Sequence, residues 1–293
     1  MILRNITLWV VVLLCQLMTG CAFQSYLINR VADSISVQDQ SEDDIVLARE
    51  ASAFYLKFSE SILRQTPGNL KLAESVGAGY TQYAYAFVAF EADQVESKDT
   101  HAAQLLRQRA AKLYARAHRH AMTALELNQP GFKQALTKKD PQLLHKLSIE
   151  QVGVAYWAAA SWGGLISLSK DDPDVVADLP LAIELARLAW TKNPEYGQGS
   201  LTSLLGTFEA SRPSGSIDKA EQLFNQAIAQ SRGESAGQWV AKAESIALAK
   251  QDRQFFIDCL QQAVIVANKY KNLQNEVMLS RATWLLEKID DLF

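Results

Sequence analysis

Helical periodicity runs through almost the whole chain, from about residue 42 to residue 291. Apolar residues recur at spacings of three and four, and the breaks fall where Pro, Gly, Asn and Asp gather. Only 14 Gly and 7 Pro occur in 293 residues, and alternating β-branched runs are scarce. The sequence therefore predicts an all-α fold without strands.

The breaks divide this region into predicted helices and give some of them a defined start. Asp172 and Pro173 place a capping acceptor and a first-position proline at one start. Pro180 lies inside a helical pattern, so that segment should kink or restart there, with Asp178 free to cap it. The predicted helices span residues 42–65, 68–96, 99–127, 141–147, 149–169, 173–192, 198–210, 217–231, 235–249, 252–269 and 273–291.

The N-terminus has the pattern of an export signal. Arg4 precedes an apolar stretch from Ile6 to Leu17, which is too short to cross a hydrocarbon core of about 30 Å as a helix. Met18-Thr19-Gly20-Cys21 resembles the bacterial lipobox, in which the cysteine thiol carries the lipid, although Met replaces the commoner Leu. An ordinary secretory signal or a short membrane anchor are the alternatives.

These features predict a signal peptide at 1–20, a lipidated tether at 21–40 and a helical domain at 41–293. Acyl chains on Cys21 would provide a stable membrane attachment. Ala22 rather than Asp follows the cysteine, which by resemblance to enterobacterial sorting rules favours the periplasmic side of the outer membrane.

Cysteine count and net charge exclude several classes of protein. If Cys15 leaves with the signal and Cys21 is acylated, Cys259 has no partner for a disulfide, and its apolar pattern predicts a core position. The net charge is −3 and basic residues are scattered, so the chain lacks the clustered Lys and Arg of a nucleic-acid-binding protein.

Small residues recur in a pattern similar to that of tetratricopeptide (TPR) helix pairs. In such repeats, small residues four and seven positions apart let two helices approach closely. Chance matches in Ala-rich helices are the alternative, but three units together predict degenerate helix-pair stacking. The units are Ala182, Ala186 and Ala189 with Pro194; Ala220, Phe224 and Ala227 with Gly206; and Ala117, Ala121 and Ala124 with Pro130.

No enzymatic motif is present, and we predict neither a catalytic site nor a cofactor or metal site. The chain has no phosphate-binding loop and no Gly-x-Ser-x-Gly elbow. His118 and His120 are two residues apart and point to different sides of a helix, which is unsuitable for shared metal ligation. A hydrolase acting on cell-wall polymer would need two carboxylates in one cleft, which the sequence cannot place.

Two helices without charged residues are rich in aromatic and small side chains. One spans 75–90 and contains Tyr80 and Tyr83; the other spans 151–169 and contains Tyr156, Trp157 and Trp162. A helix that is apolar all round is normally enclosed by protein, and rings among Gly and Ala leave space for an apolar ligand. We therefore take these five aromatics as candidate ligand-binding residues. A solid inner layer of a helical solenoid is the alternative.

Several segments resemble one known family. The similarity follows one order along nearly the whole mature chain, with departures at Ser280 and at residues 212–214. The segments are 155–163 (AYWAAASWG), 177–180 (ADLP), 220–233, 251–253 (QDR) with Phe256, and 281–286 (RATWLL) through 289–293 (IDDLF). The chain thus resembles the T-component family of tripartite ATP-independent periplasmic (TRAP) transporters, often called TatT.

The resemblance implies a periplasmic lipoprotein of TPR-like helix pairs that closes on a central pore or pocket and forms a homotrimer. It also implies a partner, the solute-binding P component of a TRAP-type uptake system, and passage or storage of a hydrophobic or organic-acid ligand. Arg281 is a candidate for attracting a ligand carboxylate, with an ordinary ion pair as the alternative. An envelope scaffold without a small-molecule ligand is the competing function.

Overall fold

The computed structural model describes residues 44–293. The predicted signal peptide (1–20), the tether (21–40) and Cys21 lie outside these residues. Within them every regular element is helical and no strand occurs, as predicted. The first half contains α2 (Ile45–Leu63), α3 (Leu70–Tyr83), η1 (Ala84–Ala89), α4 (Phe90–Val95), α5 (Thr100–Asn128), α6 (Phe132–Lys138), α7 (Pro141–Leu144), η2 (Ile149–Gln151) and α8 (Val152–Ser167).

The second half of the described chain is likewise built of helices. Its helices are α9 (Pro173–Val176), α10 (Leu179–Lys192), η3 (Tyr196–Gly199), α11 (Ser200–Ser211), α12 (Ile217–Gln230), α13 (Ala236–Lys242), η4 (Ala243–Ala247), α14 (Leu248–Lys250), α15 (Arg253–Lys269), α16 (Leu273–Glu287) and α17 (Ile289–Leu292). Two segments, η1 and η4, are π-helical and continue directly from α3 and α13. The predicted helices at 68–96 and 235–249 therefore each correspond to one continuous helical stretch.

Capping residues and prolines explain several helix ends. The structure also contains one helix, α6, that the sequence pattern does not predict. Asp172 caps α9 through its side chain, as predicted. The helical pattern restarts at α10 beside Pro180, but Asp178 makes no side-chain cap bond there because its backbone is already helical. The missed helix is α6, which is too short to show periodicity. Glu126 supports its start by accepting hydrogen bonds from the backbone of Gly131 and Lys133.

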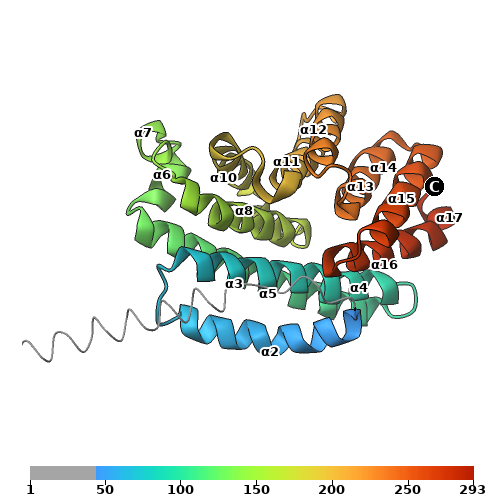
Figure 1. Ribbon diagram of the computed structural model, residues 1–293, viewed down its shortest axis with the longest axis horizontal. Helices are drawn as coiled ribbons and strands as arrows, with labels where there is room; N and C mark the ends of the chain where they lie inside the picture. Colours follow the sequence, from blue (N-terminus) through green and yellow to red (C-terminus); the bar gives the residue numbers. More distant parts are fainter. Residues whose placement is uncertain (1–43) are drawn as a thin grey trace, which may run out of the picture.

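Successive helices pack on one another along the chain. Figure 1 shows α2 along one side, α3 and α5 in the next layer, α8 above them, and α10 to α17 continuing toward the C-terminus. The last long helix, α16, returns to contact α2. The two ends of the described chain therefore meet.

The small residues of the repeat-like units lie at the helix contacts. Every alanine in the three units is fully buried, and so is Phe224. The Phe224 ring lies over Gly206, where an added Cβ would meet ring carbons at 3.2 Å. Small residues at these positions therefore let α11 and α12 approach closely, as the pattern requires.

The two aromatic-rich helices are neighbours. The α3 helix packs against both α5 and α8, and Gly77 of α3 faces Trp157 of α8. Further along α8, Gly164 receives the Tyr114 ring of α5, which an added Cβ would meet at 2.7 Å. The glycines of these helices thus make room for rings from adjacent helices.

A candidate ligand cavity between α3 and α8

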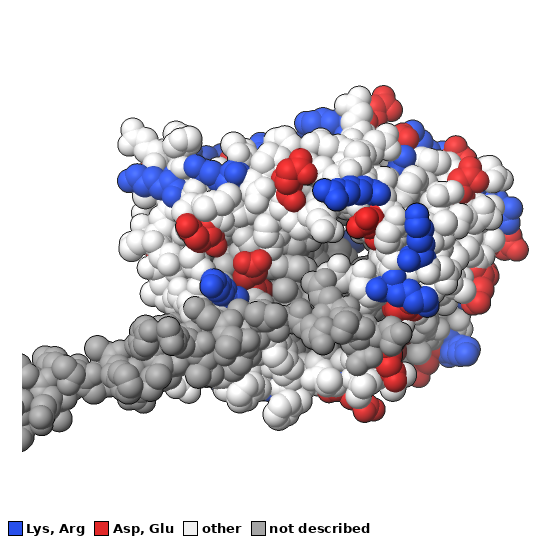
Figure 2. Space-filling view, in the orientation of Figure 1, with Lys and Arg blue, Asp and Glu red and all other residues white. Residues whose placement is uncertain are grey.

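A cavity of about 570 Å³ lies beside these two helices. This volume is within the range of small-molecule sites in proteins. Its walls come from α3, α8, the η3 turn, the start of α11 and the start of α16; they comprise Lys71, Glu74, Ser75, Ala78, Gln82, Tyr156, Trp157, Tyr196, Gly197, Gln198, Ser200 and Gln274. The molecular surface is also hollowed near the centre of the face in Figure 2, where Lys and Arg are interspersed with Asp and Glu.

Three aromatic rings form one wall of the cavity. The Tyr156 ring contacts Trp157 with 4.7 Å between centroids and Tyr196 with 5.2 Å. Burial raises the pKa of Tyr156 to about 12, although a hydrogen bond with the Ser200 hydroxyl opposes the shift. These phenols are therefore neutral at physiological pH, and their rings offer an apolar, polarisable surface.

Glu74 provides a carboxylate beside this wall. The Tyr196 hydroxyl donates a hydrogen bond to Glu74 Oε1 at 2.6 Å. Burial raises the pKa of Tyr196, and the neighbouring Glu74 charge raises it further. The carboxylate lies against Gly153 of α8, where any larger residue would collide with it. The glycine and the tyrosine hydroxyl therefore fix the position of Glu74.

Turn geometry brings Tyr196 to the cavity. The η3 segment contains Gly197 and Gly199 at positive φ, and Gln198 also has a positive φ of 51°. Gly199 is pressed against the Ala227 backbone, which leaves no space for a Cβ. This tight turn redirects the chain so that Tyr196 faces α3 and α8.

Tyr156 and Trp157 are the two predicted site residues that line this cavity. Tyr80 lies apart from it: its hydroxyl donates to the buried Glu60 at 3.2 Å, and burial raises the pKa of Tyr80 to about 12. Tyr83 is also buried and packs edge-on against Phe87. The structure thus divides the predicted aromatic set into cavity and core positions.

Trp162 and Arg281 contact other parts of the fold. The Trp162 ring packs on His118 with 4.4 Å between centroids. Arg281 Nη2 donates to Glu244 at 2.6 Å, and its Nη1 donates to Asp93 at 3.2 Å. Burial opposes the charge of Arg281, but the nearby Tyr85 and Glu244 outweigh it and raise its pKa.

Sequence reasoning missed Glu74, Lys71 and Tyr196. The charge-free segment begins at Ser75 and therefore excludes Glu74, which directly precedes it, and Lys71, which lies one turn earlier on the same helix. Tyr196 lies in the break between the predicted helices at 173–192 and 198–210, and the glycines at 197 and 199 are the sequence signal for a tight turn there.

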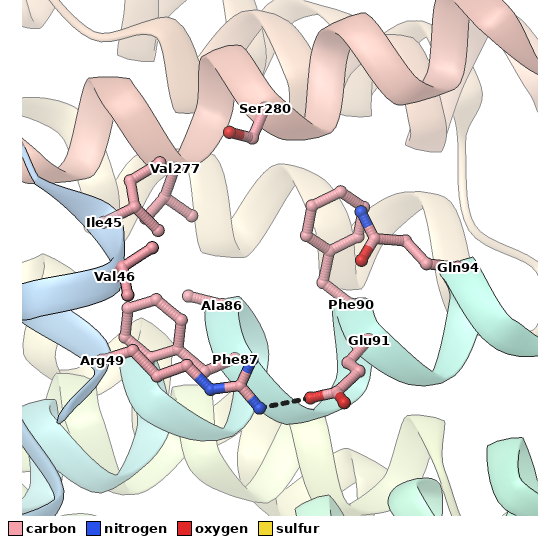
Figure 3. A pocket seen from close by; sticks show the side chains of 10 residues that line it. All are labelled: Ile45, Val46, Arg49, Ala86, Phe87, Phe90, Glu91, Gln94, Val277 and Ser280. Atoms are coloured by element: carbon pink, nitrogen blue, oxygen red, sulfur yellow. Dashed lines mark hydrogen bonds and ion pairs between the residues drawn. The ribbon is translucent and has the colours of Figure 1, made fainter.

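A second, smaller cavity lies where the chain ends meet. It has a volume of about 200 Å³ and lies between α2, the η1–α4 segment and α16. In Figure 3 the rings of Phe87 and Phe90 border it, and Arg49 forms an ion pair with Glu91 at its edge. Val277 of α16 contributes to the same cavity.

Within residues 44–293, no three His, Cys, Asp or Glu side chains are grouped so as to hold a metal ion. No helix in the same range combines the length and apolar character needed to span a membrane. Cys259 is buried and unpaired, in agreement with its predicted core position.

Comparison with known proteins identifies the family. The sequence profile described as "TRAP transporter T-component" matches residues 41–293. An uncharacterized protein of Treponema pallidum (strain Nichols) is 28% identical over 265 residues, which cover 86% of this chain and 81% of that protein. The chain therefore belongs to the TRAP transporter T-component family, a family of transporter components, and this membership implies a role in TRAP transport.

Proposed function

We propose that this protein is a lipid-anchored periplasmic accessory component that docks the solute-binding P component and holds or passes a small hydrophobic or organic-acid ligand. In this proposal residues 41–293 form one TPR-like helical domain closing on a central pore or pocket, Cys21 carries the anchor at the outer membrane, and the protein assembles as a homotrimer. Family membership supports the transport role.

The observation that carries the ligand part is the cavity between α3 and α8. It is large enough for a small organic molecule, and Tyr156, Trp157 and Tyr196 give it an aromatic wall. An apolar group that leaves water for this wall gains the free energy of burial. Tyr80, Tyr83, Trp162 and Arg281 would then act indirectly, by holding the helices around the cavity.

Ligand capture by the Trp157→Ala variant tests this proposal. The full chain is reconstituted in lipid nanodiscs, and equilibrium dialysis measures binding of 3-phenylpropanoate as an organic acid and palmitate as a hydrophobic probe. We expect at least one probe to bind and Trp157→Ala to weaken it about tenfold, since an aromatic contact and its buried area are lost. The oligomer should stay intact by light scattering.

Trp239→Ala is the matched control because Trp239 packs in the cluster of α13 to α16 and does not line the cavity. It should leave probe binding unchanged. If the wild-type protein binds neither of these probes nor any of the amino acids tested below, the ligand part of the proposal is wrong, and an envelope scaffold becomes the better account.

Two further measurements test the anchor and the partner. The Cys21→Ser variant should move from the membrane fraction to the soluble fraction after cell lysis, because it lacks the acyl chains. The wild-type protein should recover a TRAP-type P component of the same organism in a pull-down. Retention of the Cys21→Ser variant in the membrane fraction would contradict the lipid anchor. Failure to recover the P component would contradict the proposed partner.

A further inference from the structure

The polar side of the α3–α8 cavity narrows the class of ligand. This inference rests on the proposed function, since it requires that the cavity holds a ligand. The relevant residues are Lys71, Glu74 and Ser75 on α3, which line the same cavity as the aromatic wall of Tyr156, Trp157 and Tyr196.

Lys71 and Glu74 are adjacent on α3 but do not pair with each other. They are three residues apart, the spacing at which helical side chains meet. Glu74 Oε1 instead accepts the Tyr196 hydroxyl at 2.6 Å. Lys71 is exposed to solvent where it lines the cavity, and it forms no ion pair with another described residue. The cavity therefore presents one ammonium and one carboxylate side by side, each with hydrogen-bonding capacity left.

Ser75 adds a buried, unpartnered hydroxyl to the polar side of this cavity. The residue is only 8% exposed, and its Oγ has no hydrogen-bond partner among the described residues. A buried hydroxyl without a partner costs free energy, so such groups usually meet a ligand or an ordered water. Ser75 also lines the cavity.

The aromatic wall could contact both a cationic group and an apolar group of the same ligand. A cation close to Glu74 would also lie near the faces of Tyr156 and Tyr196, which attract positive charge. An apolar substituent would pack on the Trp157 ring. Lys71 would bind a carboxylate by a charge-assisted hydrogen bond.

We propose that the ligand of this cavity is an organic acid of the amino-acid type, whose carboxylate binds Lys71, whose ammonium binds Glu74, and whose apolar side chain packs on Trp157. A free fatty acid satisfies only the first and third of these contacts. A simple carboxylate leaves Glu74 without a counter-ion.

The test compares L-phenylalanine with two analogues that each lack one charged group. 3-Phenylpropanoate lacks the ammonium, and 2-phenylethylamine lacks the carboxylate. Each is offered to the full chain in lipid nanodiscs, and isothermal calorimetry measures binding. We expect L-phenylalanine to bind at least about tenfold more tightly than either analogue, because each lost charge-assisted hydrogen bond weakens binding by about that factor or more. L-Leucine and 4-methylpentanoate repeat the comparison with a smaller side chain.

Charge-removing variants assign each contact. Glu74→Gln should weaken L-phenylalanine binding about tenfold and leave 3-phenylpropanoate binding unchanged, since only the amino acid has an ammonium. Lys71→Met should weaken both acids and leave 2-phenylethylamine unchanged. The exposed residues Glu287 and Lys112 provide controls, and Glu287→Gln and Lys112→Met should alter no binding. Circular dichroism checks that each variant is folded.

The outcomes separate this inference from the proposed function. If 3-phenylpropanoate or palmitate binds in a Trp157-dependent way and neither amino acid binds more tightly than its deaminated analogue, the amino-acid inference is wrong while the ligand-binding function stands. If no probe binds at all, both are wrong. If amino acids bind but Glu74→Gln has no effect, the assignment of the ammonium contact is overturned.

Discussion

Arg281 and Asp93 form an ion pair across 188 positions of the chain, with 3.2 Å between Nη1 and Oδ2. The same guanidinium also binds Glu244 of the π-helical segment η4 and lies over the Phe90 ring at 5.3 Å. Because Asp93 belongs to α4 and Arg281 to α16, this one side chain joins a helix of the first half of the described fold to its last long helix. It does so while largely shielded from water, with 12% of the side chain exposed.

Replacing Arg281 by Met should therefore destabilise the protein strongly. The variant leaves Asp93 and Glu244 close together without their cation, and breaking a buried ion pair in this way costs about 3–5 kcal/mol. For a chain of this size we expect a fall in melting temperature of roughly 6–12 °C or more, measured by circular dichroism.

Arg253→Met is the control for the Arg281 variant. Arg253 pairs with Asp290, and both side chains are more than half exposed. Losing an exposed pair should cost less than about 1 kcal/mol. Equal melting temperatures of the two variants would contradict the role assigned to Arg281.

Glu60 should govern part of the stability at low pH. Burial by itself raises the pKa of Glu60, but hydrogen bonds from Arg116, Lys57 and His120 outweigh it and hold the pKa far below its ordinary value. A carboxyl with a lowered folded-state pKa binds fewer protons when folded than when unfolded. Its contribution is therefore fully present above the unfolded pKa of about 4.3 and is lost as the pH falls below that value.

Urea unfolding between pH 6 and pH 3 measures this contribution. The wild-type protein should lose more free energy of unfolding over that interval than Glu60→Gln, since the variant has no carboxyl to protonate. Glu91→Gln, at an exposed ion pair, should retain the wild-type slope. Parallel pH profiles for wild type and Glu60→Gln would refute the prediction.

Gly164→Ala should destabilise the contact between α5 and α8. Alanine is normally the better helix former by about 1 kcal/mol. Here, however, its Cβ would meet Tyr114 ring atoms at 2.7 to 2.8 Å, so the buried ring must move. We expect a net loss of about 1–3 kcal/mol in chemical denaturation.

Gly237 offers a matched position in α13. An added Cβ there meets its nearest neighbour, Met278, at 3.5 Å, which is an ordinary contact. Gly237→Ala should be neutral or stabilise by up to about 1 kcal/mol. A Gly164→Ala variant as stable as Gly237→Ala would show that the Tyr114 ring yields without cost.

Cys259 should resist thiol reagents in the folded protein. Burial raises the pKa of its thiol to about 11, and the side chain is almost fully enclosed. At pH 8 only about one thiol in a thousand would be ionised, and the thiolate is the reactive form. Ellman's reagent should therefore react slowly with the native protein and rapidly in guanidinium chloride. Rapid labelling of the native protein would contradict the burial of Cys259.

The sequence by itself determined the helices of this protein and the positions where helices touch. Periodicity and cap residues such as Asp172 act within a few residues, so they could be read from the chain directly. The spacing of Ala182, Ala186 and Ala189 likewise predicted a buried contact face, because side chains three and four apart share one side of a helix. The short helix α6 escaped this reasoning because its support comes from Glu126 on the preceding helix.

Only the tertiary structure decided which aromatic residues border a cavity and which fill the core. Tyr80 and Tyr156 both lie among small and aromatic residues in the sequence. Tyr80 nevertheless donates a hydrogen bond to Glu60 of α2, whereas the Tyr156 ring packs on Tyr196 of the η3 turn. Glu74 accepts a hydrogen bond from Tyr196, 122 positions away, and Arg281 pairs with Glu244 and Asp93, which are 37 and 188 positions away. Such partners are set by how distant helices pack, because burial and hydrogen bonding between distant segments depend on all their neighbours at once and leave no local pattern in the chain.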